Sequence, residues 1–92
     1  MPNRRTVFFV SDRTGITAEM LGNSLLSQFD DIEFQRLTIP FGDSPEKIAG
    51  VIEQINETTV REERPPIVFS SIVDEAMSDT LRRHTNALTL DL

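Results

Sequence analysis

The sequence predicts an α/β protein, a three-layer sandwich in which a four-stranded parallel sheet with the strand order 2-1-3-4 lies between helices. Short runs of β-branched and apolar residues alternate along the chain with segments of helical periodicity, which gives the order βαβαβαβ. Strands that alternate with helices are joined by right-handed crossovers, and these produce a parallel sheet covered on both faces. The chain has 92 residues and no internal linker, repeat or low-complexity tract, so we expect one domain over residues 1–92.

Four segments have the composition of strands. Residues 6–10 (TVFFV) and 67–71 (IVFSS) are nearly continuous apolar runs, as expected of parallel strands buried on both faces. Residues 33–39 (EFQRLTI) alternate between polar and apolar side chains, which predicts a less buried strand at an edge. Residues 87–92 (ALTLDL) form a fourth strand that runs to the chain end. We therefore expect the chain to be a fragment of a longer protein, or a partner to cover that edge.

Three helices connect these strands. Over residues 16–29, apolar side chains recur at three- and four-residue steps, which predicts a buried stripe made of Ile16, Met20, Leu21, Leu25 and Phe29. A second helix begins after an N-cap at Asp43 or Ser44, and its propensity fades over residues 56–59. A third helix begins with acidic residues at 74–75 and ends with basic residues at 82–84, which complements the helix dipole.

Composition excludes several classes of function. Nine basic and fifteen acidic residues give a formal net charge of −6, which argues against nucleic acid and against an anionic membrane surface as partners. The chain has no cysteine and one histidine, so it offers no thiolate zinc site, no thiol nucleophile and no histidine-rich metal site. We therefore expect no bound metal. Without a long apolar run or a signal-peptide pattern, the chain is predicted to be cytoplasmic and to lack a membrane segment.

Polar residues follow the first and third predicted strands. In an open parallel sheet, ligands bind beyond the carboxyl ends of the strands where the strand order reverses, which here is between strands one and three. The candidate anion- or phosphate-binding residues at this point are Ser11, Asp12, Arg13, Thr14, Gly15, Thr17, Ser70 and Ser71. Free backbone amides and the dipole of the helix that follows make such a turn suitable for an anion.

The first predicted helix has the N-terminus best suited to a phosphate. The second and third helices begin with carboxylates of their own, at Asp43 and Glu46 and at Asp74 and Glu75. Between residues 14 and 18 there is no acid. The start of this helix is therefore left open to an external anion.

Alternatives remain for individual residues of this turn. Thr14 could be an ordinary N-cap and Gly15 an ordinary turn residue. Asp12 could repel an anion, hold a divalent cation or act as a base. The chain has no G-x-x-x-x-G-K-[ST] motif, which excludes a self-sufficient P-loop kinase, and no catalytic residue is assigned.

Several segments together resemble one bacterial family. They are residues 8–19 (FFVSDRTGITAE), 21–29 (LGNSLLSQF), 38–41 (TIPF), 64–70 (RPPIVFS) and 90–92 (LDL). In this order they resemble the N-terminal region of the bifunctional regulatory proteins of phosphoenolpyruvate synthase and of pyruvate, phosphate dikinase. The first two segments are more similar to the synthase branch, and the likeness extends over nearly the whole chain.

The resemblance implies an unusual activity for the full-length protein. Members of this family are ADP-dependent Ser/Thr kinases that inactivate the target enzyme by phosphorylating a threonine, and they reverse this with inorganic phosphate and release pyrophosphate. ADP and inorganic phosphate are thus implied for the full-length protein, with phosphoenolpyruvate synthase as its partner. The family's nucleotide P-loop lies downstream, in a C-terminal nucleotide-binding domain.

The resemblance leads to several expectations about this chain. It is an N-terminal domain that packs with its own C-terminal nucleotide-binding domain, carries no cofactor itself and is inactive alone. The loop over residues 11–17 binds an anion, or helps to dock the target enzyme or a bound phosphate. Arg13 stands where family members often have a small residue, so this loop departs from the family pattern.

Two other functions fit the same residues. The pattern Ser11-x-x-Thr14-Gly15-x-Thr17 also resembles the FMN phosphate loop of flavodoxins, which share this topology, although the chain has no Trp or Tyr to flank a flavin ring. A flavodoxin-like FMN-binding domain is therefore one alternative. The other alternative is a non-catalytic protein-interaction module that binds no small ligand at the switch point of the sheet.

Overall fold

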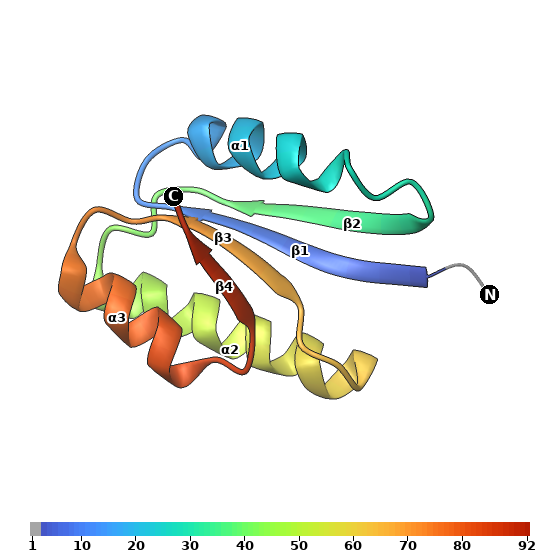
Figure 1. The fold of residues 1–92 in the computed structure, drawn as a ribbon. Coiled ribbons are helices and arrows are strands. Elements are labelled where there is room, and N and C mark those ends of the chain that lie inside the picture. Colours follow the sequence, from blue (N-terminus) through green and yellow to red (C-terminus); the bar gives the residue numbers. More distant parts are fainter. Residues whose placement is uncertain (1–2) are drawn as a thin grey trace.

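A computed structural model describes residues 3–92 and confirms the predicted α/β fold (Figure 1). Its elements are β1 (Asn3–Ser11), α1 (Ile16–Leu26), β2 (Ile32–Ile39), α2 (Pro45–Glu62), β3 (Ile67–Ser71), α3 (Glu75–His84) and β4 (Leu88–Asp91). The strands are parallel and are hydrogen-bonded in the order β2-β1-β3-β4. Helix α1 covers one face of the sheet, and α2 and α3 cover the other (Figure 1).

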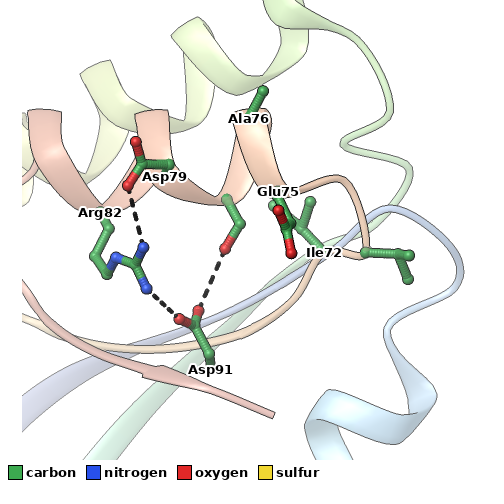
Figure 2. Close-up of a pocket in the computed structure, with 8 residues that line it drawn as sticks. Ile72, Glu75, Ala76, Asp79, Arg82 and Asp91 are labelled. Carbon is green, nitrogen blue, oxygen red and sulfur yellow. Dashed lines mark hydrogen bonds and ion pairs between the residues drawn. The ribbon is translucent and has the colours of Figure 1, made fainter.

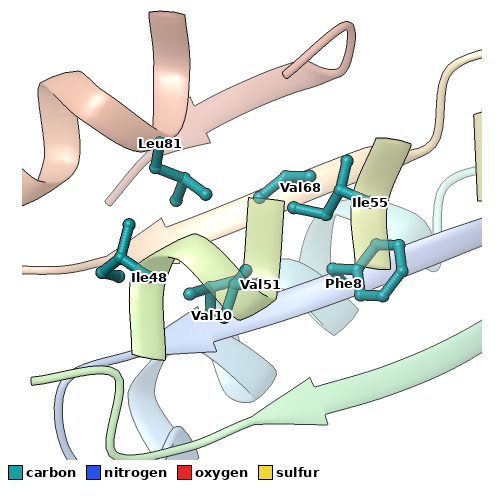
Figure 3. Packing of buried hydrophobic residues seen from close by; sticks show 7 residues of the cluster. All are labelled: Phe8, Val10, Ile48, Val51, Ile55, Val68 and Leu81. Atoms are coloured by element: carbon teal, nitrogen blue, oxygen red, sulfur yellow. The ribbon is translucent and has the colours of Figure 1, made fainter. Parts of the chain in front are cut away.

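Each face of the sheet has its own apolar core. On the α2 and α3 face, the central strands pack against both helices through Phe8, Val10, Ile48, Val51, Ile55, Val68 and Leu81 (Figure 3). On the α1 face the core is smaller and consists of Val7, Phe9, Ala18, Leu26 and Phe69. Strands β1 and β3 contribute to both cores, which agrees with their continuous apolar sequences. The alternating burial along β2 likewise agrees with its place at an edge.

The buried face of α1 differs from the predicted one. The residues of α1 that are buried are Ala18, Gly22 and Leu26, whereas the predicted stripe of Ile16, Met20, Leu21, Leu25 and Phe29 is exposed. Small side chains at the first two buried positions bring the helix backbone close to the rings of Phe9 and Phe69, which stack with their centroids 5.6 Å apart. Helix α1 can pack this closely on the sheet only with small residues at the contact. The larger apolar residues therefore lie on its exposed side.

Polar contacts hold the flank of α1 that faces β2. The Thr38 hydroxyl donates a hydrogen bond to the Glu19 carboxylate, and Arg36 Nε donates one to Asn23 Oδ1 at 2.6 Å. Glu19 and Asn23 thus contact side chains of the edge strand. These bonds fix the rotation of the helix about its axis.

Helix α2 is longer than predicted because tertiary contacts compensate for weak helix propensity. Thr58 is buried against the rest of the protein, and its hydroxyl is satisfied within the helix by a hydrogen bond of 2.9 Å that it donates to the Gln54 carbonyl. Thr6 of β1 donates a hydrogen bond of 2.6 Å to the carboxylate of Glu62 in the last turn. The helix therefore continues through residues 56–59 and ends at Glu62, and its C-cap residue Glu63 has φ of 57°.

The remaining boundaries are close to the predicted ones. Ser44 and Asp74 are the N-caps of α2 and α3, and they accept hydrogen bonds from the amides of Lys47 and Met77. Strand β1 is longer than predicted, and α1 ends at Leu26 instead of residue 29. Within residues 3–92, no helix combines the length and the apolar character needed to cross a membrane.

Candidate functional site

The switch point of the sheet lies between β1 and β3, as predicted from the strand order. The two strands pair directly, with Val10 opposite Ser70 and Ser11 opposite Ser71. Beyond their carboxyl ends is a cleft of about 620 Å³. The residues that line this cleft are Ser11, Asp12, Arg13, Thr14, Gly15, Ile16, Thr17, Ser71, Ile72, Val73 and Leu92.

The N-terminus of α1 opens into this cleft without a side-chain cap. Gly15 occupies the N-cap position, and it has no side chain to accept a hydrogen bond from the first turn. Helices α2 and α3 both have such a cap, from Ser44 and Asp74. The first-turn amides of α1 therefore point at the cleft with their positive dipole end uncompensated by a cap.

Thr14 does not cap α1, so the alternative in which it is an ordinary N-cap is wrong. Its hydroxyl oxygen lies 3.5 Å from the Ile16 amide nitrogen, which is at the outer limit of a hydrogen bond. Both Thr14 and Thr17 are exposed and line the cleft. Their hydroxyl groups are thus placed to donate to a ligand.

Gly15 is required at its position for two reasons. Its φ of +87° lies in the left-handed region, which residues with a side chain rarely adopt. A Cβ atom at this position would also lie 2.9 Å from Cγ2 of Thr38 on β2. The turn between β1 and α1 can therefore lie close to the sheet only with glycine.

The residues at the end of β1 stabilise the loop internally. Ser11 is buried, and its hydroxyl oxygen accepts a hydrogen bond of 3.0 Å from the Arg13 amide. The Arg13 side chain is exposed and takes part in none of the ion pairs found within residues 3–92. Its guanidinium is therefore available to a ligand in the cleft.

Asp12 joins the two sides of the cleft. Its carboxylate accepts a hydrogen bond of 3.0 Å from the backbone amide of Val73, which belongs to the loop after β3. Within the described part of the chain, no group of three or more His, Asp or Glu residues is placed to hold a metal ion. The structure thus gives Asp12 a structural contact, and its carboxylate lines the same cleft as the candidate anion-binding turn.

Ser70 and Ser71 are placed on opposite faces of the sheet. Ser71 lines the cleft, whereas Ser70 is buried and lies outside it. Successive side chains of a strand point to opposite faces, so Ser70 faces α2 and α3 as Val68 does. The prediction that Ser70 belongs to the anion site therefore does not fit the structure. All the other candidate residues line the cleft.

A third loop, which the sequence reasoning missed, supports the site. After β2, the amide of Phe41 donates a hydrogen bond of 2.7 Å to the Arg13 carbonyl, and the amide of Gly42 donates one of 2.7 Å to the Ser11 carbonyl. Phe41 has φ of 60°, an uncommon conformation for a residue with a large side chain. This loop follows the carboxyl end of a strand, so the rule that located the other two loops also applies to it.

A second hollow of about 570 Å³ lies between α3 and the end of β4 (Figure 2). Among the described residues that line it, the only basic one is Arg82, which forms ion pairs of 3.1 Å with Asp79 and 2.7 Å with Asp91. The hydrogen bond that Arg82 donates to Asp79 and the negative charge of Asp91 raise the pKa of Arg82 above its ordinary value. Because both carboxylates already pair with the guanidinium, this hollow is poorly suited to an anion.

Known proteins are similar to this chain over nearly its whole length. The profile of the family described as kinase/pyrophosphorylase matches residues 7–92. A protein of Laribacter hongkongensis is 48% identical over 91 residues, which are 99% of this chain and 33% of the relative. One of Alkalilimnicola ehrlichii is 52% identical over 88 residues, which are 96% of this chain and 31% of the relative.

Both relatives are provisionally named phosphoenolpyruvate synthase regulatory protein. A protein of Leptothrix cholodnii with the same name is 50% identical over 92 residues, which are 100% of this chain and 33% of the relative. The chain therefore spans about a third of the length of the curated relatives that it matches. No solved structure matches the chain. Since the family profile matches nearly all of the sequence, the chain belongs to the kinase/pyrophosphorylase family.

Proposed function

We propose that the chain is the N-terminal part of a regulator that reversibly phosphorylates a threonine of phosphoenolpyruvate synthase. In this proposal the forward reaction uses ADP, and the reverse reaction uses inorganic phosphate and releases pyrophosphate. Family membership and the names of the relatives support the reaction class and the target enzyme. The nucleotide site is assigned to a further domain, so this chain alone is expected to be inactive.

The contribution of this chain is to bind a phosphate group at the cleft between β1 and β3. The observation that carries this assignment is the uncapped N-terminus of α1, in a fold where α2 and α3 are both capped by side chains. Backbone amides at a helix start bind phosphate through both hydrogen bonds and the helix dipole. Arg13 adds a positive charge, and the hydroxyls of Thr14 and Thr17 add donors.

This arrangement fits a phosphate that is held and released rather than one that is permanently bound. Asp12 contributes a negative charge to the same lining, which lowers the affinity for an anion. The cleft is open to solvent at the exposed residues Arg13, Thr14 and Thr17, so water screens part of the attraction. We expect a dissociation constant for inorganic phosphate on the order of 1 mM.

An amide chemical-shift titration of the isotope-labelled chain tests the binding assignment. Inorganic phosphate is expected to shift the amides of residues 15–18 and to leave those at the start of α2 unchanged, because Ser44 caps that helix. Parallel titrations with ADP and FMN distinguish the candidate ligands. Shifts with FMN at micromolar concentration, accompanied by quenched flavin fluorescence, would favour the flavodoxin-like alternative.

The catalytic assignment is tested with phosphoenolpyruvate synthase as substrate. The chain alone is compared with a chimera in which it replaces the matching third of the Laribacter hongkongensis relative. ADP-dependent phosphate incorporation into the synthase is expected only with the chimera. Incorporation with the chain alone would show that the nucleotide site lies within these 92 residues and would overturn the proposal.

A further inference from the structure

Exposed leucines lie on the sheet face that carries α1. They are Leu21 and Leu25 of α1, with exposed fractions of 48% and 45%, and Leu88 and Leu90 of β4, with exposed fractions of 57% and 39%. These four residues are here called the leucine face. Leucines that gather in one place on a surface indicate a site of contact with another protein segment.

The register of the sheet places the two β4 leucines on the α1 side. Leu88 pairs with Ile67 and Leu90 pairs with Phe69 across a parallel ladder, where paired residues point to the same face. Phe69 belongs to the core beneath α1, and Ile67 packs against that core. Leu88 and Leu90 therefore extend this apolar surface beyond the part that α1 covers.

The contacts of α1 place its two leucines beside the same strip of sheet. Glu19 and Asn23 bond to side chains of β2, so their flank of the helix faces that edge. Leu21 and Leu25 each follow one of these residues by two positions, which is a rotation of roughly 200° about the helix axis. They lie on the opposite flank, toward β3 and β4.

The two faces of the sheet are covered unequally. Helices α2 and α3 lie on one face, and α1 alone lies on the other (Figure 1). Parallel sheets are normally covered on both faces, because their strands expose apolar side chains on each side. The strip over β3 and β4 beside α1 is thus the place where a covering element is absent from the described residues.

We propose that the leucine face docks an amphipathic helix from the part of the family protein that lies outside this chain. The relatives are about three times as long as their match to this chain, so most of such a protein is available to supply that helix. A second copy of this chain is a poorer occupant, because each copy carries a net charge of −6 and the copies repel each other.

The docked helix would lie beside the candidate phosphate site. Leu92 lines the cleft and lies two positions after Leu90 of the leucine face. A helix on the leucine face therefore reaches the rim of the cleft and brings the remaining family domain next to the bound phosphate. The inference rests on the proposed function in one respect, namely that the working protein is longer than this chain.

Thiol labelling measures whether the leucine face is covered, and the absence of native cysteine makes the chain well suited to this method. Leu90→Cys is introduced into the chain and into the chimera with the Laribacter hongkongensis relative, and the modified residue is identified by peptide mass spectrometry. Val60→Cys serves as the matched control, because Val60 is an exposed apolar residue of α2 on the other face. Reaction rates with a maleimide are compared at several protein concentrations.

The expected result is fast labelling of both cysteines in the chain, and labelling of residue 90 that is at least about tenfold slower in the chimera. Equal rates at residue 90 in the chain and the chimera would overturn the proposal. Slow labelling in the chain that becomes faster on dilution would also overturn it, because a second copy would then be the occupant. If the chimera does not fold, the same comparison uses the chain co-expressed with the remainder of the relative as a separate polypeptide.

This test is independent of the proposed function, because it reads neither phosphate binding nor phosphorylation. If phosphate does not shift the amides, the labelling result still stands. If labelling at residue 90 is the same in the chain and the chimera, the phosphate result still stands. Leu90→Asp in the chimera gives a second readout. It is expected to lower the thermal stability of the chimera more than that of the chain, whereas Val60→Asp is expected to affect both equally.

Discussion

The carboxylate of Asp12 accepts a hydrogen bond of 3.0 Å from the backbone amide of Val73, and this bond joins the loops that follow β1 and β3. The same carboxylate lines the cleft into which α1 directs its uncapped amides. Asp12 therefore has two effects that oppose each other. The bond holds the cleft in shape, while the charge weakens the attraction of an anion to it.

Two substitutions of Asp12 separate these effects. Asp12→Asn keeps an oxygen that accepts from the Val73 amide but removes the charge, so phosphate affinity is expected to rise about three- to tenfold at low salt. Asp12→Ala removes the bond as well and is expected to lower the free energy of unfolding by about 1 kcal/mol. Phosphate titration and urea unfolding measure the two quantities. An unchanged or weaker phosphate affinity in Asp12→Asn would show that the charge does not act on the site.

Gly15→Ala is expected to destabilise the protein by about 1–3 kcal/mol, because alanine is strained at φ of +87° and its Cβ would lie 2.9 Å from Cγ2 of Thr38. Thr38→Ser removes that methyl group and keeps the hydroxyl, so the double variant recovers the part of the loss due to the contact. Gly50→Ala is the control, since the added Cβ would meet no other described part of the protein within 4 Å, the backbone of its own helix aside, and alanine favours helix α2. If Gly15→Ala were as stable as the unmodified chain, this account of the turn would be wrong.

Gly22→Ala tests the close packing of α1 on the sheet. The added Cβ would lie 2.3 Å from Cε1 of Phe9 and 3.0 Å from Cδ2 of Phe69, so the helix or the rings must move. A net loss of about 1–2 kcal/mol is expected, because the strain exceeds the gain in helix propensity. Chemical unfolding measures the loss, and the Phe9→Leu background should reduce it. A stabilising effect comparable to that of Gly50→Ala would contradict the observed orientation of α1.

The pKa of the Asp43 carboxyl is lowered from its ordinary value of 3.8, first by the hydrogen bond from Lys47 and then by the positive charge of that residue. A pKa that is lower in the folded state stabilises the fold above the unfolded-state value, and this contribution is lost as the pH falls through the folded value. Carboxyl NMR titration of Lys47→Met is expected to bring the pKa back toward 3.8, and Lys47→Arg is expected to keep it low. The same low pKa in Lys47→Met would remove Lys47 as the cause.

The order of elements could be predicted from the sequence because buried parallel strands and amphipathic helices have different periods. The large apolar residues did not reveal which side of α1 packs against the sheet. The buried residues Ala18, Gly22 and Leu26 recur at the same helical spacing as the exposed Leu21 and Leu25, so both sets form a stripe along the helix. Periodicity identifies both stripes of α1 but does not show which of them packs against the sheet. The packing distance to the sheet, which favours small residues, decides between them.

The position of the cleft at the switch point could also be predicted, since it follows from the strand order. Ser70 was included among the candidates together with Ser71, but side chains alternate along β3, so Ser70 is buried and lies outside the cleft. The contacts of Phe41 and Gly42 with the first loop depend on how three loops meet in space. No local pattern in the sequence specifies such contacts.

The most direct measurement of the central claim compares phosphate titrations and unfolding of Thr17→Asp and Thr17→Asn. Thr17 lies in the first turn of α1, two positions ahead of Glu19, the acidic residue of that turn, so an aspartate there adds a negative charge closer to the helix start. We expect Thr17→Asp to raise the free energy of unfolding by about 0.3–1 kcal/mol and to weaken phosphate binding at least about tenfold, while Thr17→Asn changes both much less. Loss of stability in Thr17→Asp, or phosphate shifts at residues 15–18 that are the same in both variants, would contradict the assignment of a phosphate site to this helix start.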